Sequence, residues 1–384
     1  MYRVIRVGAA VAAMIVLGAC EEPGKTVRVP ATTTSAAATT TTSPEQARLT
    51  GELAEGMRIA EVLALPTDID PSFVRHSSSD VLTSARLLVV AGHHKGIADV
   101  ADEHGLLAGF VSQRSNGSAE LDDREWLTHG VMRFPDADTA TTAADDFALA
   151  ATTERGMLQT ADRTAASLPS APETRYVQLD DRDRDRFEVM AFTPHGDYVV
   201  FTMVGGRTLP DLDAIVVRAL EQQEPLLDSF TPTPETELSA LPYDPDGIFE
   251  LSVGEQGSGR GAYRRHAAVL FAEDQQAAVT LYAEVGLSAM AVKGSTVYRT
   301  AGADSARELA TALTAAIAAA WDKTATPAPA DVPGAACLTD GEEYANSWVC
   351  LVSSGRHVGE VWAKTQDEAH AGAREQHRVL AAAT

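Results

Sequence analysis

The feature that most limits how this chain can fold is a sequence pattern that occurs twice. The segment 105–111 (GLLAGFV) resembles 286–292 (GLSAMAV), and 131–140 resembles 297–306 through the shared skeleton V-x-R-x-x-x-A-D-[ST]-A. A third pair of similar segments follows these two in the same order along the chain. We infer an internal duplication, so any fold adopted by one copy must also suit the other.

The third pair has the sequence of a β-hairpin. Residues 187–202 turn at 194–197 (PHGD), and residues 348–362 turn at 353–356 (SSGR), with apolar runs on both sides of each turn. A helix is expected after each hairpin, over 209–221 and over 366–382.

Glycine and aspartate mark the expected helix ends within each copy. Gly105 and Gly286 follow amphipathic stretches, where a left-handed glycine commonly ends a helix. Asp138 and Asp304, each followed by a hydroxyl residue, are placed to cap an alanine-rich helix. Each copy is therefore predicted to run α-β-β-α-β-β-α, an antiparallel sheet with helices packed on one face, which is the α+β class.

A proline-rich joint over 231–247 separates the two copies. It gives an N-terminal α+β domain at 47–240 and a C-terminal α+β domain at 241–384, and 45% hydrophobic with 22% charged residues is ordinary for such domains. The first copy is longer by 15 residues between its glycine and the arginine of the skeleton. We assign this excess to a polar loop or extended hairpin around 114–124.

The first 20 residues have the composition of a secretory leader. Arg3 and Arg6 precede an apolar stretch, 7–16, that is too short to span a bilayer. The stretch ends in Leu-Gly-Ala-Cys, which resembles a bacterial lipobox, where the cysteine sulfur takes the lipid. We therefore expect a signal peptide at 1–19 and a lipid on Cys20 that anchors the protein to the extracytoplasmic face of the cell membrane. An ordinary secretory peptide, cut elsewhere, is the alternative.

Residues 20–46 are rich in threonine, alanine and proline and contain almost no large apolar side chain. A segment of this composition buries too little surface to fold. We expect a disordered stalk between the lipid bilayer and the first domain.

Two cysteines follow Cys20, at positions 337 and 350. In an oxidising compartment, a pair this close in sequence predicts one disulfide, Cys337–Cys350. Two free buried thiols are the alternative.

The formal net charge of −23 limits the partners of the chain. An acidic surface repels phosphate backbones, so we expect no nucleic-acid partner. Arg260, Arg264 and Arg265 form a basic cluster on this acidic chain. The cluster is a candidate patch for an anionic cell-wall ligand or for the acidic surface of another envelope protein, and a local counter-charge is the alternative.

The sequence contains no recognisable catalytic or metal-binding constellation. His93, His94 and His104 form the densest histidine group, but they lack the HExxH spacing and its carboxylate. Ser258 lies in a glycine run that does not match the GxSxG spacing of a hydrolase nucleophile. We therefore predict no catalytic residue, no metal site and no cofactor.

Segments spread over nearly the whole mature chain resemble a family of actinobacterial lipoproteins that carry a domain of unknown function, DUF7373. The likeness lies at 56–61, 108–110, 133–136, 192–196, 230–234, 241–247 and 296–299. The resemblance implies an envelope location and a two-domain layout, and it supplies no catalytic residue. The extracytoplasmic sensor modules of mycobacterial kinases are distantly similar in the order of helices and hairpins, which is a likeness of fold and not of function.

Three classes of function remain after these exclusions. The first is a non-catalytic ligand-binding or sensing module of the cell envelope, anchored by lipid and presenting a cleft between its two domains. The second is a structural or accessory protein that assembles with other envelope proteins. The third is an unrecognised hydrolase, because a catalytic triad is assembled in space and need not show in the sequence.

Overall fold

The computed structural model describes residues 43–383, apart from 119–123, 158, 160, 182–185, 207, 255–258 and 343. The predicted signal peptide, Cys20 and positions 20–42 of the predicted stalk lie outside the described residues. Helix α1 (Pro44–Ile59) begins three residues before the predicted start of the first domain, and the side chain of Ser43 caps it. In the described part of the chain, no helix combines the length and the apolar character that crossing a membrane requires.

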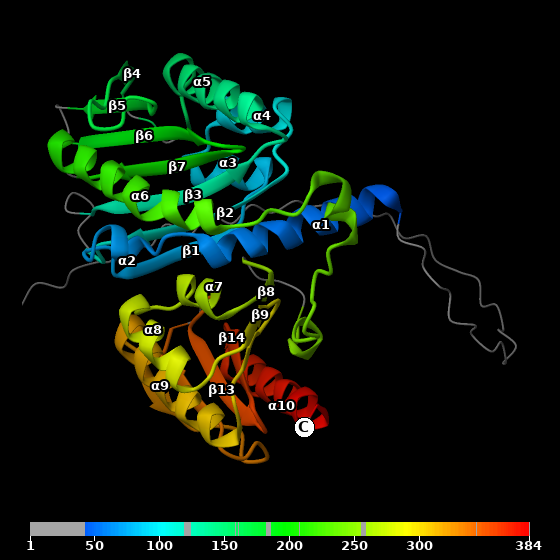
Figure 1. Ribbon diagram of the computed structural model, residues 1–384. Coiled ribbons are helices and arrows are strands. Elements are labelled where there is room, and N and C mark those ends of the chain that lie inside the picture. The colour runs from blue at the N-terminus through cyan, green and yellow to red at the C-terminus, as the bar shows by residue number, and fades with distance from the viewer. Residues whose placement is uncertain are drawn as a thin grey trace, which may run out of the picture. The chain divides into compact units, whose positions relative to one another are not determined.

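Seven antiparallel strands of the N-terminal half form one sheet, in the order β1-β2-β3-β7-β6-β5-β4 (Figure 1). The strands are β1 (Arg75–Val81), β2 (Ala108–Ser115), β3 (Trp126–Arg133), β4 (Arg163–Ala166), β5 (Arg175–Asp181), β6 (Arg186–His195) and β7 (Tyr198–Gly205). The predicted hairpin of β6 and β7 turns at Gly196, whose φ of 58° is the left-handed conformation that favours glycine.

The C-terminal half forms a second seven-stranded sheet, in the order β8-β9-β10-β14-β13-β12-β11. The strands are β8 (Gly261–Tyr263), β9 (Ala289–Val292), β10 (Thr296–Arg299), β11 (Thr324–Thr326), β12 (Ala336–Thr339), β13 (Trp348–Ser354) and β14 (His357–Ala363). Counted within each half, the two strand orders are identical. The α+β class and the duplication predicted from the sequence are therefore confirmed, and the halves are called the N-terminal and C-terminal repeats below.

The strand pairing makes the two repeats equivalent residue by residue. Arg133 of β3 lies opposite Tyr198 of β7, and Arg299 of β10 lies opposite His357 of β14. The two arginines are the ones that the shared skeleton aligns. Each position of β3 and β7 therefore has a defined counterpart in β10 and β14.

Helices cover both faces of each sheet, so the predicted packing on a single face is wrong. The helices of the first repeat, after α1, are α2 (Pro66–Ile69), α3 (Ser84–Val90), α4 (Lys95–Glu103), α5 (Ala137–Thr153) and α6 (Leu209–Ser229). Helices α3, α4 and α5 pack on one face, whereas α1 and α6 pack on the other (Figure 1). Successive strand residues point to opposite faces, and neighbours such as Phe110 and Val111 are both fully buried. A strand that is apolar at consecutive positions needs cover on both sides.

The C-terminal repeat follows the same plan. Its helices are α7 (Arg265–Leu270), α8 (Gln275–Glu284), α9 (Ala303–Trp321) and α10 (Gln366–Ala382). Helix α10 packs on one face of the sheet, whereas α9 packs on the other. Gly105 and Gly286, which end the equivalent helices α4 and α8, adopt φ values of 67° and 61°, as their predicted role requires.

Helix α5 begins earlier than the sequence predicts. Asp136, not Asp138, is its N-cap, because the Asp136 carboxylate accepts a hydrogen bond of 2.8 Å from the backbone nitrogen of Thr139. In the second repeat Gly302 holds the N-cap position without a side-chain cap. Asp138 and Asp304 therefore lie in the first helical turn, where a negative charge is favourable toward the helix dipole.

The predicted disulfide joins Cys337 of β12 to Cys350 of β13. The two residues lie directly opposite each other on neighbouring antiparallel strands, with their Cα atoms 4.1 Å apart. Both are buried in the apolar core beneath α10. The disulfide prediction is confirmed, and the bond ties two strands of the second sheet together.

Candidate functional site at the junction of the repeats

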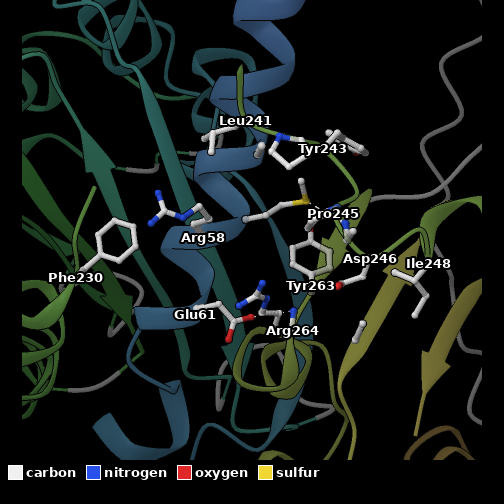
Figure 2. A pocket seen from close by; sticks show the side chains of 15 residues that line it. Arg58, Glu61, Phe230, Leu241, Tyr243, Pro245, Asp246, Ile248, Tyr263 and Arg264 are labelled. Carbon is white, nitrogen blue, oxygen red and sulfur yellow. Dashed lines mark hydrogen bonds between the residues drawn. The ribbon is translucent and has the colours of Figure 1, made fainter. Parts of the chain in front are cut away.

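A pocket of about 370 Å³ opens where α1, the proline-rich joint 231–247 (called the linker below) and the edge of the second sheet meet (Figure 2). Its lining residues are Ala54, Met57, Arg58, Glu61, Phe230, Leu241, Pro242, Tyr243, Pro245, Asp246, Ile248, Ala262, Tyr263, Arg264 and Ala289. We call it the junction pocket. Residues Ser43–Thr384 form one compact unit, so the pocket belongs to a single body.

One face of α1 and the 3-10 turn after it, η1 (Ala60–Val62), supplies the first wall. Ala54, Met57, Arg58 and Glu61 recur at helical spacing, which places them on one face. The thioether sulfur of Met57 accepts a hydrogen bond of 3.0 Å from the backbone nitrogen of Ala262 in β8. The wall of one repeat therefore contacts the edge strand of the other directly.

Glu61 caps a helix of the opposite repeat. Its Oε1 accepts hydrogen bonds from the backbone nitrogens of Arg264, at 2.9 Å, and Ala267, at 3.4 Å. Helix α7 has no side-chain cap of its own at Arg264, so Glu61 takes that place. Burial raises the pKa of the Glu61 carboxyl, and the nearby His266 and the two backbone donors oppose the shift.

A buried carboxylate holds the start of the linker against the first repeat. Glu55 is fully buried and accepts hydrogen bonds from Arg133 Nη1 at 3.1 Å, from the Thr233 backbone nitrogen at 2.9 Å and from the Thr233 hydroxyl at 2.9 Å. Arg58 pairs with the same carboxylate at 2.5 Å, and its guanidinium lies 5.1 Å from the centre of the Phe230 ring. The charge of Glu55 is balanced by two arginines, which a buried carboxylate requires.

The arginines of the shared skeleton fix the two ends of the linker. Arg133 donates to the backbone oxygen of Thr233 at 2.7 Å, and Arg299 donates to the backbone oxygen of Asp246 at 3.0 Å. Asp246 lines the junction pocket, as Figure 2 shows. One equivalent side chain of each repeat thus positions the segment that forms the pocket's second wall.

The remaining wall is mostly aromatic and aliphatic. Tyr243 of the linker donates its hydroxyl to the backbone oxygen of Arg260 at 3.2 Å and packs edge-on against Phe249, with ring centres 5.2 Å apart. Tyr263 is buried and donates its hydroxyl to the backbone oxygen of Gly259 at 2.9 Å. Both phenols have partners, so these residues present apolar surface to the pocket.

The predicted basic cluster is divided by the fold. Arg264 lines the junction pocket, is exposed, and lies near enough to Glu61 for its charge to oppose the rise in the pKa of that carboxyl. Arg260 lies outside the lining, with its guanidinium 5.1 Å from the centre of the Phe249 ring. Arg265 is the exposed first residue of α7 and does not line the pocket. Only one of the three candidate residues therefore reaches the pocket.

Arg114 is a junction residue that the sequence did not reveal. The excess length of the first repeat lies in an extended hairpin, as one of the two predicted alternatives had it, because β2 and β3 are longer than their counterparts β9 and β10. Arg114 is a buried residue of β2 in this hairpin. Its guanidinium donates to the backbone oxygens of Phe73, Val74, Ala272 and Glu273. Two of these acceptors belong to each repeat, so Arg114 binds the repeats together.

Two of the three histidines that suggested a metal, His94 and His104, have other partners. His94 caps α4, with its Nδ1 accepting from the Ile97 nitrogen at 3.4 Å, and His104 Nε2 lies 2.8 Å from Asp146. Across the described part of the chain, no group of three His, Cys, Asp or Glu side chains is placed to hold a metal ion. Ser258 lies outside the described residues.

One serine–histidine contact bears on the hydrolase alternative. His76 Nε2 lies 3.3 Å from the Ser79 hydroxyl, but Ser79 is buried and donates to the backbone oxygen of Leu270 at 2.9 Å. Neither residue lines a pocket described above. A nucleophile must reach its substrate, and the Ser79 hydroxyl is instead a fixed part of the contact between the repeats.

Comparisons with known proteins follow the same division into two repeats. The family model for the N-terminal domain of unknown function DUF7373 matches residues 40–243, and the model for the DUF7373 C-terminal domain matches residues 243–383. A search of curated proteins finds no match. Among solved structures, the extracellular domain of PknH from Mycobacterium tuberculosis is similar with 17% identity and a TM-score of 0.29, over 40% of this chain and 81% of that chain. The two family matches meet within the linker and together span nearly all of the described residues, so this chain belongs to the DUF7373 family.

Proposed function

We propose that this protein is a lipid-anchored, extracytoplasmic and non-catalytic binding module, and that the junction pocket holds its ligand. The anchor is Cys20, because a short apolar leader with two arginines delivers a lipobox-like cysteine. The Cys337–Cys350 disulfide supports an oxidising compartment outside the cytoplasm. A protein that is exported and anchored in this way would meet its ligand at the cell surface or within the envelope.

The observation that carries the binding role is the construction of the junction pocket. Three segments far apart in the sequence, α1, the linker and the edge of the second sheet, form its walls, and each is held by hydrogen bonds to another part of the fold. Ligand sites are typically preformed concave surfaces with apolar walls and a few placed polar groups. The junction pocket has this composition.

The lining also indicates the class of ligand. The aromatic and aliphatic residues favour an apolar body, whereas the exposed guanidinium of Arg264 favours an anionic group at its end. Arg58 is already engaged by Glu55. We therefore propose an amphipathic anion as the ligand, with its charge toward Arg264.

A fluorescent amphipathic anion tests this proposal. The probe is 1-anilinonaphthalene-8-sulfonate, added to the purified full chain and excited directly. Ala262→Phe fills the pocket from β8, and Ala325→Phe is the matched control on the exposed edge strand β11 of the same sheet. We expect saturable binding to the wild type and to Ala325→Phe, loss of binding in Ala262→Phe, and an affinity about five- to tenfold lower in Arg264→Gln.

Circular dichroism must show that each variant is folded, because this dye also binds expanded states. Equal binding to Ala262→Phe and to the wild type would place the dye elsewhere and contradict the proposed site. Unchanged affinity in Arg264→Gln would remove the anionic part of the proposal.

A further inference from the structure

A second pocket, of about 170 Å³, lies within the C-terminal repeat between α8, α9 and the second sheet. Its lining residues are Phe271, Ala272, Glu273, Asp274, Ala277, Ala278, Leu281, Tyr282, Tyr298, Ala312, Leu313, Ala316, Ile317, Glu360 and Trp362. We call it the carboxylate pocket. It shares no lining residue with the junction pocket, so the following inference is independent of the proposed function.

Glu360 of β14 is the central acidic group of the carboxylate pocket. The residue is only 8% exposed, and its carboxylate accepts hydrogen bonds from the Tyr298 hydroxyl at 3.1 Å and from Trp362 Nε1 at 2.5 Å. No cationic side chain of the described residues pairs with it. Burial raises the pKa of the Glu360 carboxyl, which is the response expected of a carboxylate without a counter-ion.

Glu273 adds a second carboxylate to the same wall. Its Oε1 accepts a hydrogen bond of 2.9 Å from Trp321 Nε1, whereas its Oε2 is buried and has no partner. Arg75 and Arg114 lie near enough to oppose the rise that burial causes in the pKa of Glu273. Glu360 has no such neighbours, so it is the group that most requires a cation.

The first repeat has a fully buried phenylalanine, Phe201, at the position equivalent to Glu360. Gly130 of β3 pairs with Phe201 of β7, and the equivalent pair in the second repeat is Thr296 of β10 with Glu360 of β14. Phe201 therefore occupies the position of Glu360. In the first repeat this position is part of a filled apolar core.

The filling of that core is aromatic. Phe201 stacks on Phe192 with ring centres 5.3 Å apart, and Phe192 stacks on Phe147 of α5 at 5.1 Å. By the aligned skeleton, the counterpart of Phe147 is Leu313 of α9, a smaller side chain that lines the carboxylate pocket. The second repeat has thus lost aromatic volume and gained a buried charge at one location.

Both changes work against stability unless something occupies the space. An empty cavity forfeits packing, and a buried carboxylate without a cation carries a desolvation cost. A positively charged group with a short apolar body would fill the volume, balance Glu360 and contact the rings of Tyr282, Tyr298 and Trp362, whose faces attract cations. Glu273, Asp274 and Glu360 all line this pocket, but among the described residues no group of three His, Cys, Asp or Glu side chains is placed to hold a metal ion.

We propose that the carboxylate pocket is a binding site for a small organic cation, an ammonium group on a short apolar body, with Glu360 as its counter-charge. The ammonium group faces Glu360 and the unpartnered Glu273 oxygen. The apolar body lies among the side chains of α8 and α9.

Isothermal titration of the purified full chain with n-butylammonium chloride tests this site, with n-butanol as the neutral probe of similar size. We expect one butylammonium per chain with a Kd below about 10 mM, and no binding of butanol in that range. Glu360→Gln keeps the size of the side chain and should lower the affinity at least about tenfold. Glu284→Gln, an exposed carboxylate on α8, is the matched control and should bind as the wild type does.

A second variant keeps the test decisive if Glu360→Gln disturbs the fold. Ala316→Leu fills the carboxylate pocket from α9 without touching either carboxylate, and it should abolish binding. Absence of butylammonium binding to the wild type at about 10 mM would overturn the proposal. So would equal binding of butanol, or unchanged affinity in folded Glu360→Gln and Ala316→Leu.

Discussion

Arg114 of the first repeat donates from its Nη1 to the backbone oxygen of Ala272 in the second repeat, 2.9 Å away. The same guanidinium donates to the backbone oxygen of Phe73 in the first repeat at 2.9 Å and to the backbone oxygen of Glu273 in the second repeat at 2.5 Å. Burial lowers the pKa of Arg114 to about 10, and the nearby Glu273 and Asp274 carboxylates oppose this shift. The side chain still carries its charge at neutral pH. Backbone oxygens of both repeats accept its hydrogen bonds, and the two nearby carboxylates belong to the second repeat.

Replacing Arg114 should therefore weaken the whole body rather than one repeat. Arg114→Met leaves four backbone oxygens without their donor, and we expect a loss of about 2–4 kcal/mol in the free energy of unfolding. Urea denaturation followed by circular dichroism measures this loss. Arg307→Met, at an exposed position of α9, is the control and should change stability by no more than about 0.5 kcal/mol. Equal stability of the two variants would show that the repeats do not depend on the Arg114 contacts.

The cap that Glu61 provides across the junction should be measurable by itself. Glu61→Ala removes the acceptor for the first backbone nitrogens of α7, and loss of such a cap costs about 1 kcal/mol. Glu308→Ala, an exposed residue within α9, is the control. In thermal unfolding, the Tm of Glu61→Ala should lie below that of Glu308→Ala. This decrease should be several degrees smaller than the decrease that Arg114→Met shows relative to Arg307→Met. A stability of Glu61→Ala equal to that of Glu308→Ala would mean that α7 needs no cap from the first repeat.

The disulfide should stabilise the C-terminal repeat by restricting its unfolded chain. Cys337 and Cys350 are 13 positions apart, and a loop of about that length corresponds to about 3 kcal/mol in the chain-entropy treatment. The double variant Cys337→Ala with Cys350→Ala should lose at least this much free energy of unfolding. Dithiothreitol should lower the wild-type stability and leave the double variant unchanged. A wild type that does not respond to full reduction would contradict the stabilising role.

His129 should make the fold less stable in mild acid. The ring is fully buried, with Nδ1 3.1 Å from the Thr202 hydroxyl and Nε2 3.1 Å from Gln223 Oε1. Gln223 Oε1 also accepts from the backbone nitrogen of Ala64, so His129 Nε2 must be the donor and Nδ1 the acceptor. The neutral ring satisfies both of these partners. Burial accordingly lowers the pKa of His129 to about 4.

The direction of the pH effect follows from linkage. Below the unfolded pKa of about 6.5, the unfolded chain binds a proton that the folded chain does not accept until about pH 4. Stability should therefore fall as pH decreases through this window, by on the order of 3 kcal/mol from His129. His129→Gln should be less stable at pH 7 but should show a flatter profile between pH 6.5 and pH 4. His93→Asn, at an exposed position, should keep the wild-type profile, and an equally steep profile in His129→Gln would refute this assignment.

The sequence predicted the parts of the fold that depend on local chemistry. The hairpin at Gly196, the helix ends at Gly105 and Gly286 and the disulfide all follow from residues close in the chain. The edge strand β1 was missed because its sequence, RHSSSDV, is polar and gains its place only by pairing with β2. The packing of helices on both faces of each sheet was missed. It depends on which helix packs against each apolar strand position, and tertiary packing decides this.

The two pockets depend on residues too distant in sequence for a local pattern to join them. Glu61 and Arg264 meet across 203 positions, and nothing in either neighbourhood predicts the contact. Glu360 did leave a signal that comparison of the repeats reveals. In β7 the positions Val199, Phe201 and Met203 are apolar, and the counterpart of Phe201 in β14 is acidic. An acidic residue at a core position of a duplicated strand marks a place where the interiors of the two copies differ.

Export is the claim on which the proposed function depends most. Intact mass spectrometry of the protein extracted from its native membrane measures it directly, because acylation and cleavage change the mass at a known residue. We expect a chain that begins at Cys20 and carries a thioether-linked diacylglyceryl group, with Cys337 and Cys350 oxidised. A chain that retains Met1, or one whose Cys20 is a free thiol, would contradict the anchor and with it the role outside the cell.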